Sequence, residues 1–130
     1  MKPKNIVILG STGSIGINTL KIIERFPSRF KVIGLTAYNN DELLENQVKQ
    51  FSPCYVAIHK KKMSSFKSKI KGLTVLDVDV DLEMLVALKE VDIVVIAMKG
   101  SAALGPFLSA VKSGKIIAPA NKEALVIAVS

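Results

Sequence analysis

The sequence predicts a doubly wound α/β fold, a mostly parallel sheet with helices on both faces. Its short apolar runs are continuous rather than alternating, as strands buried on both faces require. Segments with the helical period follow these runs and suit the crossovers between parallel strands. A glycine-rich turn, Gly10 to Gly16, joins the first apolar run to the first helical segment. In such folds ligands bind beyond the carboxyl ends of the strands, so the residues that follow strands are the informative ones.

The first elements are a buried strand over residues 5–9 and a helix that begins at Ser14 and stops before Pro27. The apolar residues of this helix recur with the helical period and predict one buried stripe. They are Ile15, Leu20, Ile22, Ile23 and Phe26. A second apolar run predicts a strand over residues 30–37.

Asn40 is a suitable N-cap for the next helix, expected over residues 41–51, because its side chain can accept from a free backbone N–H. Cys54 is expected to be a small buried residue before the third strand. The remaining elements continue the alternation of strand and helix. We expect strands over residues 55–58, 74–76, 93–97 and 116–118, and helices over residues 63–70, 81–88 and 102–112.

Composition excludes several classes of protein. The 130 residues, 49% of them hydrophobic, suffice for one globular domain with a core. No apolar run approaches the roughly 20 residues that span a bilayer, and the N-terminus has no leader pattern, so we expect a cytoplasmic protein without a membrane partner. Cys54 and His59 are the only cysteine and histidine, which excludes an internal disulfide and a Cys/His zinc site. His59 is expected to be an ordinary loop histidine.

The net charge of +7 does not predict nucleic-acid binding, because the lysines are dispersed and no RNA-binding or helix-turn-helix signature occurs. The densest basic stretch is Lys60-Lys61-Lys62 followed by Lys67, Lys69 and Lys71. Such a stretch is usually a solvated helix face. The alternative is that it contributes positive potential toward an anionic ligand.

The glycine turn has the chemistry of a phosphate site. Glycines allow positive φ and a close approach of the backbone, and the following helix offers free N–H groups with partial positive charge. Thr12 and Ser14 add hydroxyl donors. No Gly-Lys-Ser/Thr ending follows, which argues against a nucleoside-triphosphate loop. The candidate residues of this turn are Gly10, Thr12, Gly13, Ser14, Ile15 and Gly16.

The segment after the second strand bears on which dinucleotide binds. NAD-binding domains usually place an acidic residue there for the ribose hydroxyls, and here Tyr38 and Asn39 occupy that place. A 2′-phosphate is therefore tolerated, so we expect NADPH, with amide donors from Asn39 and Asn40. Tyr38 either lies against the adenine or is a partly exposed loop tyrosine. Asp41 comes late and is interpreted as a first-turn acid of the next helix rather than a ribose ligand.

A third polar group, Asn121-Lys122-Glu123, follows the last expected strand. Asn121 is a suitable cap for a further helix, and the pair Lys122 and Glu123 could form a surface ion pair. The alternative interpretation is that these residues have a functional role, because they follow the carboxyl end of a strand. Lys122 would then supply a cation for a substrate phosphate or oxyanion, and Glu123 an acceptor for the nicotinamide end of the cofactor.

Taken together, these segments resemble the 1-deoxy-D-xylulose 5-phosphate reductoisomerase family. GSTGSIG (residues 10–16) and ANKEALV (residues 120–126) are similar to its N-terminal signatures, and the likeness includes Phe51-Ser52-Pro53 and Val91-Asp92. The resemblance implies a Rossmann-type NADPH-binding domain. It implies that the first turn holds the cofactor phosphates and ribose, that Asn121 and Glu123 hold its other end, and that Lys122 reaches the substrate. Tyr38-Asn39-Asn40 keeps only the last residue of the family's usual Gly-Lys-Asn triplet.

The resemblance also implies a reaction, in which deoxyxylulose phosphate is isomerised on Mg²⁺ or Mn²⁺ and the aldehyde formed is reduced by NADPH. The metal ligands and the substrate phosphate pocket of the family lie beyond this sequence. We therefore expect residues 1–130 to be the NADPH-binding domain of a longer, homodimeric enzyme, without catalytic or metal-binding residues and inactive alone. Two alternatives stay open. One is a domain of another NADPH oxidoreductase, of the semialdehyde dehydrogenase or dihydrodipicolinate reductase type; the other is a non-enzymatic nucleotide-sensing domain.

Overall fold

The predicted doubly wound fold is present in the computed structural model, which describes residues 2–118 and Leu125. Six strands form one all-parallel sheet in the order β4-β3-β2-β1-β5-β6. The strands are β1 (Lys4–Leu9), β2 (Phe30–Thr36), β3 (Tyr55–Ile58), β4 (Thr74–Asp77), β5 (Ile93–Ile96) and β6 (Ile116–Ala118). The strand order reverses between β1 and β5, which is where such sheets open a crevice for ligands.

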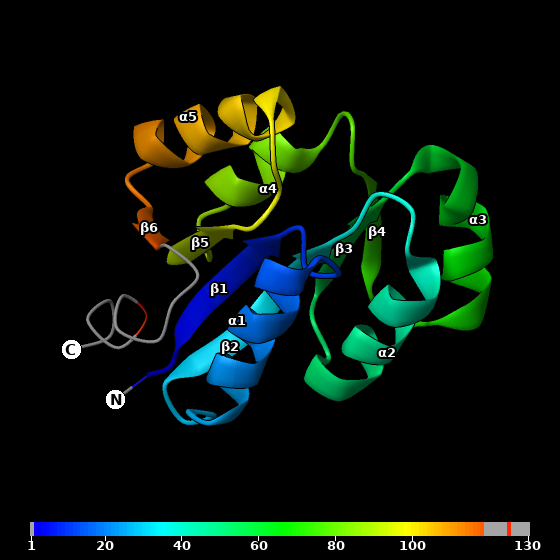
Figure 1. Cartoon of the computed structure of the whole chain (residues 1–130), viewed down its shortest axis with the longest axis horizontal. Coiled ribbons are helices and arrows are strands. Elements are labelled where there is room, and N and C mark those ends of the chain that lie inside the picture. The colour runs from blue at the N-terminus through cyan, green and yellow to red at the C-terminus, as the bar shows by residue number, and fades with distance from the viewer. Residues whose placement is uncertain (1, 119–124, 126–130) are drawn as a thin grey trace.

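Helices cover both faces of the sheet (Figure 1). Three of them, α1 (Ser14–Glu24), α2 (Asp41–Phe51) and α3 (Lys60–Lys69), pack on one face. The other face carries α4 (Leu82–Ala87) and α5 (Leu104–Lys112), the latter preceded by a 3₁₀ turn at Ser101–Ala103. The chain changes face at the long crossover from β4 through α4 to β5. This crossover brings the β4–α4 loop across the carboxyl ends of the strands.

The core explains why the sequences of the strands are continuous apolar runs. In β1, Ile6 and Ile8 belong to the cluster under α1, α2 and α3, whereas Val7 and Leu9 belong to the cluster under α4 and α5. All four side chains are fully buried. Because successive side chains of a strand point to opposite faces, both sets must be apolar when helices cover both faces. Leu125 is buried in the first cluster.

Two sequence-based details of the helices are wrong. Ile15 is 41% exposed, and the buried stripe of α1 consists of Gly16, Thr19, Leu20 and Ile23. Helix α3 begins at Lys60, three residues earlier than expected, because His59 acts as its N-cap. The His59 Nδ1 accepts from the backbone N–H of Lys61 at 3.2 Å, so this histidine is a helix cap rather than an ordinary loop residue.

Cys54 is also placed differently from the prediction, since it is exposed. Its backbone N–H donates to the carbonyl oxygen of Ile33 at 3.0 Å, at the amino end of β3, where the sheet meets solvent. Within the described residues, no helix is both long and apolar enough to cross a membrane.

Candidate functional site

A cavity of about 500 Å³ lies over the carboxyl ends of β1, β2 and β5. The glycine turn after β1 and Tyr38 after β2 form one part of its wall, as the sequence predicts. The rest is formed by the end of β2, the β4–α4 loop with the start of α4, the residues after β5, and the segment that leads into α5. Of the predicted residues, those that line the cavity are Gly10, Thr12, Gly13 and Tyr38. The site therefore lies at the reversal of strand order, where a ligand of this fold is expected.

Two glycines of the turn are required by the fold itself. Gly10 has φ +87°, and a Cβ there would lie 2.9 Å from the backbone N of Met98. Gly16 has no room either, because a Cβ would lie 2.1 Å from the carbonyl oxygen of Gly10. These glycines let the turn after β1 approach the end of β5 and the start of α1. Neither needs a ligand to explain it.

Gly13 is different, because none of the residues that the structure describes requires a glycine there. Its backbone is extended, with φ −79° and ψ 171°, which any residue can adopt. A Cβ on Gly13 would meet only the carbonyl oxygen of Gly10, at 4.0 Å. Gly13 lines the cavity and is exposed. The missing side chain thus leaves room for a group that approaches the backbone from the cavity.

The start of α1 faces this space without a cap of its own. Gly13 is the N-cap residue, no side chain caps the helix, and its first turn has no acidic residue. Ser14 and Ile15 are exposed there and Thr12 is half-buried. Uncapped N–H groups and the positive end of the helix dipole favour an anion. The residues that are present fit a dinucleotide pyrophosphate.

A buried polar cluster that sequence reasoning missed anchors the turn. The N–H of Gly10 donates to Thr36 Oγ1 at 2.8 Å, and the Ser11 hydroxyl donates to Gln47 Oε1 at 2.7 Å. Gln47 Nε2 in turn donates to the Ser11 carbonyl oxygen at 2.8 Å. The turn is thus tied to the end of β2 and to α2. The available signal was Gln47 itself, a polar residue on the stripe with Leu44 and Val48.

We expect the substitution Gln47→Leu to lower the free energy of unfolding by about 1–3 kcal/mol, because it removes both hydrogen bonds and leaves buried polar groups of Ser11 without these partners. Urea denaturation followed by circular dichroism measures this. The matched control is Asn46→Leu, an exposed position of the same helix, which should change stability by less than about 0.5 kcal/mol. Equal effects at the two positions would show that the buried cluster does not stabilise the turn.

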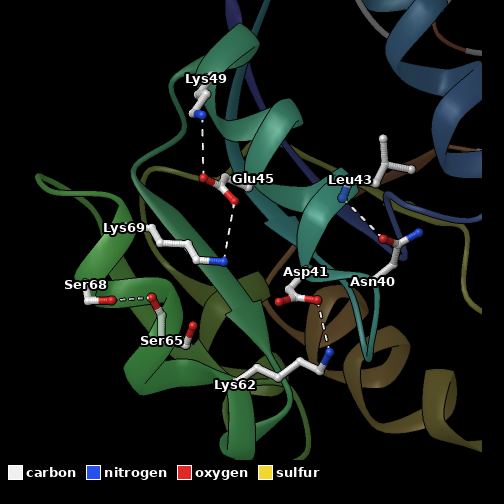
Figure 2. Close-up of polar contacts among 9 residues, drawn as sticks. All are labelled: Asn40, Asp41, Leu43, Glu45, Lys49, Lys62, Ser65, Ser68 and Lys69. Carbon is white, nitrogen blue, oxygen red and sulfur yellow. Dashed lines mark hydrogen bonds and ion pairs between the residues drawn. The ribbon is translucent and has the colours of Figure 1, made fainter.

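The loop after β2 holds the second group of predicted residues. The strand ends at Thr36 and is followed by Ala37, so no carboxylate stands at its end. Tyr38 is 51% exposed, and its ring contacts His59 edge-on with 5.0 Å between centroids. Asn39 and Asn40 are exposed. Asn40 Oδ1 accepts from the N–H of Leu43 at 3.2 Å, so the predicted cap is confirmed, and the amide nitrogen points away from the helix (Figure 2).

Asp41 lies in the first turn of α2, as predicted, but its partner comes from α3. Lys62 Nζ donates to Asp41 Oδ1 at 3.0 Å. This hydrogen bond holds the pKa of the Asp41 carboxyl below its ordinary value. Residues 38–40 themselves contain no cation. The sequence signal for this lysine was the basic stretch at residues 60–62, whose position beside the loop depends on the packing of α3 against α2.

The third predicted group, Asn121, Lys122 and Glu123, lies outside the described residues. Its roles stay predictions. Sequence reasoning also missed the cavity wall formed by residues 78–80 after β4 and by Ala97 and Met98 after β5. Both segments follow the carboxyl ends of strands, which was the available signal. Among the residues that the structure describes, no group of three His, Cys, Asp or Glu residues is placed to hold a metal ion.

Comparison with known families identifies the family of this chain. The sequence profile of the family described as 1-deoxy-D-xylulose 5-phosphate reductoisomerase matches residues 6–129, which is nearly the whole chain. This chain belongs to the 1-deoxy-D-xylulose 5-phosphate reductoisomerase family. The reductoisomerase of Thermodesulfovibrio yellowstonii is 48% identical over 126 residues, or 96% of this chain, and that of a Thermoanaerobacter species is 43% identical over 127 residues. The chain spans about a third of the reductoisomerases that it matches, 33% of each of these two.

Solved reductoisomerase structures share the fold. A crystal structure of DOX-P reductoisomerase in complex with NADPH, fosmidomycin and magnesium has a TM-score of 0.86 and 33% identity, and it covers 95% of this chain and 31% of that one. The Zymomonas mobilis reductoisomerase in complex with NADPH has a TM-score of 0.79 and 34% identity, over 95% of this chain and 33% of its own. The predicted fold class and family are confirmed.

Proposed function

We propose that this chain is the NADPH-binding part of a reductoisomerase that converts 1-deoxy-D-xylulose 5-phosphate to 2-C-methyl-D-erythritol 4-phosphate. The observation that carries the proposal is the cavity wall at Gly13, where the backbone leaves room over an uncapped helix N-terminus. Membership of the family, two of whose solved members hold NADPH, supports the choice of cofactor.

Different residues of the chain bind different parts of the cofactor. The N–H groups at the start of α1 and the hydroxyl of Thr12 hold the pyrophosphate, and the buried cluster of Ser11, Thr36 and Gln47 fixes the turn in position. Tyr38, which lines the cavity, and the adjoining Asn39 and Asn40 would receive the adenosine. NADPH, when bound, supplies the hydride for the reduction. Asn121 and Glu123 would hold its nicotinamide end.

The other parts of the proposal concern the whole enzyme. Lys122 reaches the phosphorylated sugar, and a divalent metal, Mg²⁺ or Mn²⁺, is held outside residues 1–130. The domain binds cofactor and does not turn over substrate alone. We further propose that the whole enzyme is a cytoplasmic homodimer with neither a nucleic-acid nor a membrane partner.

The experiment is a fluorescence titration of the purified chain with NADPH and, in parallel, with NADH. We expect saturable binding of NADPH at least about tenfold tighter than that of NADH, which corresponds to about 1.4 kcal/mol. Circular dichroism on the same sample shows that the chain is folded. A folded chain that binds neither dinucleotide would refute the cofactor assignment for this chain. Steady oxidation of NADPH after addition of substrate and magnesium would contradict the expectation that it is inactive alone.

A further inference from the structure

Lys62 is the cation that the fold brings to the loop after β2. Three contacts join the first turn of α3 to this loop. The N–H of His59 donates to the carbonyl oxygen of Tyr38 at 3.3 Å, the two rings meet edge-on, and Lys62 Nζ donates to Asp41 Oδ1 at 3.0 Å. Figure 2 shows the Lys62 side chain extending from α3 to Asp41. These contacts therefore keep Lys62 beside the loop.

This loop is where dinucleotide-binding domains distinguish their two cofactors. A carboxylate near the end of the second strand binds the ribose 2′-hydroxyl of NAD, whereas a nearby cation accommodates the 2′-phosphate of NADP. Residues 36–40 contain neither a carboxylate nor a cation. The first charge after the strand is Asp41, and the charge that meets it is that of Lys62. Discrimination between the two cofactors at this position thus depends on the ion pair between Asp41 of α2 and Lys62 of α3.

We propose that Lys62 recognises the 2′-phosphate of the dinucleotide and so makes this chain select NADPH over NADH. The proposal deepens the function proposed above and rests on it. An ammonium has three donors, and Asp41 accepts one of them, so two remain for phosphate oxygens. The side chain of Lys62 is 37% exposed, so a phosphate can reach it.

The Asp41 partner does not prevent this role. An ion pair at such exposure is worth about 0–1 kcal/mol, so the ammonium can turn toward a phosphate dianion without a large loss. The ion pair also favours binding of the 2′-phosphate, because the positive charge of Lys62 compensates the negative charge of Asp41, which would otherwise repel it. The lowered pKa of Asp41 agrees with an ionised carboxylate at neutral pH. Lys69 of α3, by contrast, pairs with a different residue. Its Nζ lies 4.0 Å from Oε2 of Glu45, which is further along α2 than Asp41.

Two pairs of ligands isolate the 2′-phosphate, namely NADPH with NADH, and 2′,5′-ADP with 5′-AMP. Dissociation constants are measured for the native chain, Lys62→Ala and Lys62→Arg, at fixed ionic strength. The control Lys67→Ala removes the same charge from an exposed position at the other end of α3. We expect Lys62→Ala to weaken binding of NADPH and 2′,5′-ADP about tenfold and to change NADH and 5′-AMP by less than about twofold. Lys62→Arg should retain most of the preference, and Lys67→Ala all of it.

The outcomes separate this proposal from the one it rests on. If the native chain prefers NADPH and Lys62→Ala keeps that preference, or loses affinity equally for both members of each pair, the role of Lys62 is wrong and the proposed function stands. If the native chain is folded and binds neither dinucleotide, both fail. The double variant Lys62→Ala/Asp41→Ala tests the contact itself. Because it removes the repulsive carboxylate but restores no donor, we expect partial recovery, and full recovery would overturn the direct contact.

Discussion

Gly16→Ala is expected to destabilise the chain by about 3 kcal/mol or more. The added Cβ would lie 2.1 Å from the carbonyl oxygen of Gly10 and 2.6 Å from the Cα of Ser11. Both are backbone atoms, so no side-chain rotation relieves the overlap, and α1 would have to move away from the turn after β1. Urea denaturation followed by circular dichroism measures the effect. A loss below about 1 kcal/mol would show that the close contact between the turn and α1 does not constrain the fold.

Gly13→Ala is expected to have the opposite effect: it should keep the stability of the chain and weaken the binding of the cofactor. The backbone there suits alanine and a Cβ has no neighbour closer than 4.0 Å, so the free energy of unfolding should change by less than about 1 kcal/mol. The methyl group would occupy the space in which we place the pyrophosphate. Overlap of this kind costs about 1–3 kcal/mol, so we expect the Kd for NADPH to rise roughly 30-fold.

The control for Gly13→Ala is Asn18→Ala, on the exposed face of the same helix. It should leave both stability and the affinity for NADPH close to those of the native chain. Binding of NADPH by Gly13→Ala with unchanged affinity would mean that no ligand approaches the backbone at this position. The pair Gly13 and Gly16 thus separates a glycine that the fold requires from one that only a ligand explains.

The alternation of strands and helices could be predicted from the sequence because the inner strands of the sheet are buried on both faces. Hydropathy then marks every strand, even one as short as β4. The stripe of α1 was predicted less well, since one of its buried positions is Gly16, a residue without a side chain. A pattern based on hydropathy follows large apolar residues and cannot detect a position buried because it is small. Ile15 was therefore placed inside and is exposed.

The site could be predicted only where one local segment forms it. The glycine turn joins a strand to a helix, so its place in the fold follows from its neighbours in sequence. The pairing of Gln47 with Ser11 and of Lys62 with Asp41 depends on how α2 and α3 pack, which no local pattern contains. The same holds for the cavity wall after β4, because the long crossover to β5 brings it over the strand ends. These residues could be assigned to the site only from the structure.

The central claim is that NADPH binds over Gly13, at the end of β1 and β2. Backbone amide NMR of the ¹⁵N-labelled chain during a titration with NADPH tests it most directly, since every N–H reports separately. We predict the largest shift changes at residues 13–15 and 38–41, with smaller changes on the far side of the sheet. Changes centred instead on the apolar pocket between α5 and β6, around Leu104 and Phe107, would contradict the claim.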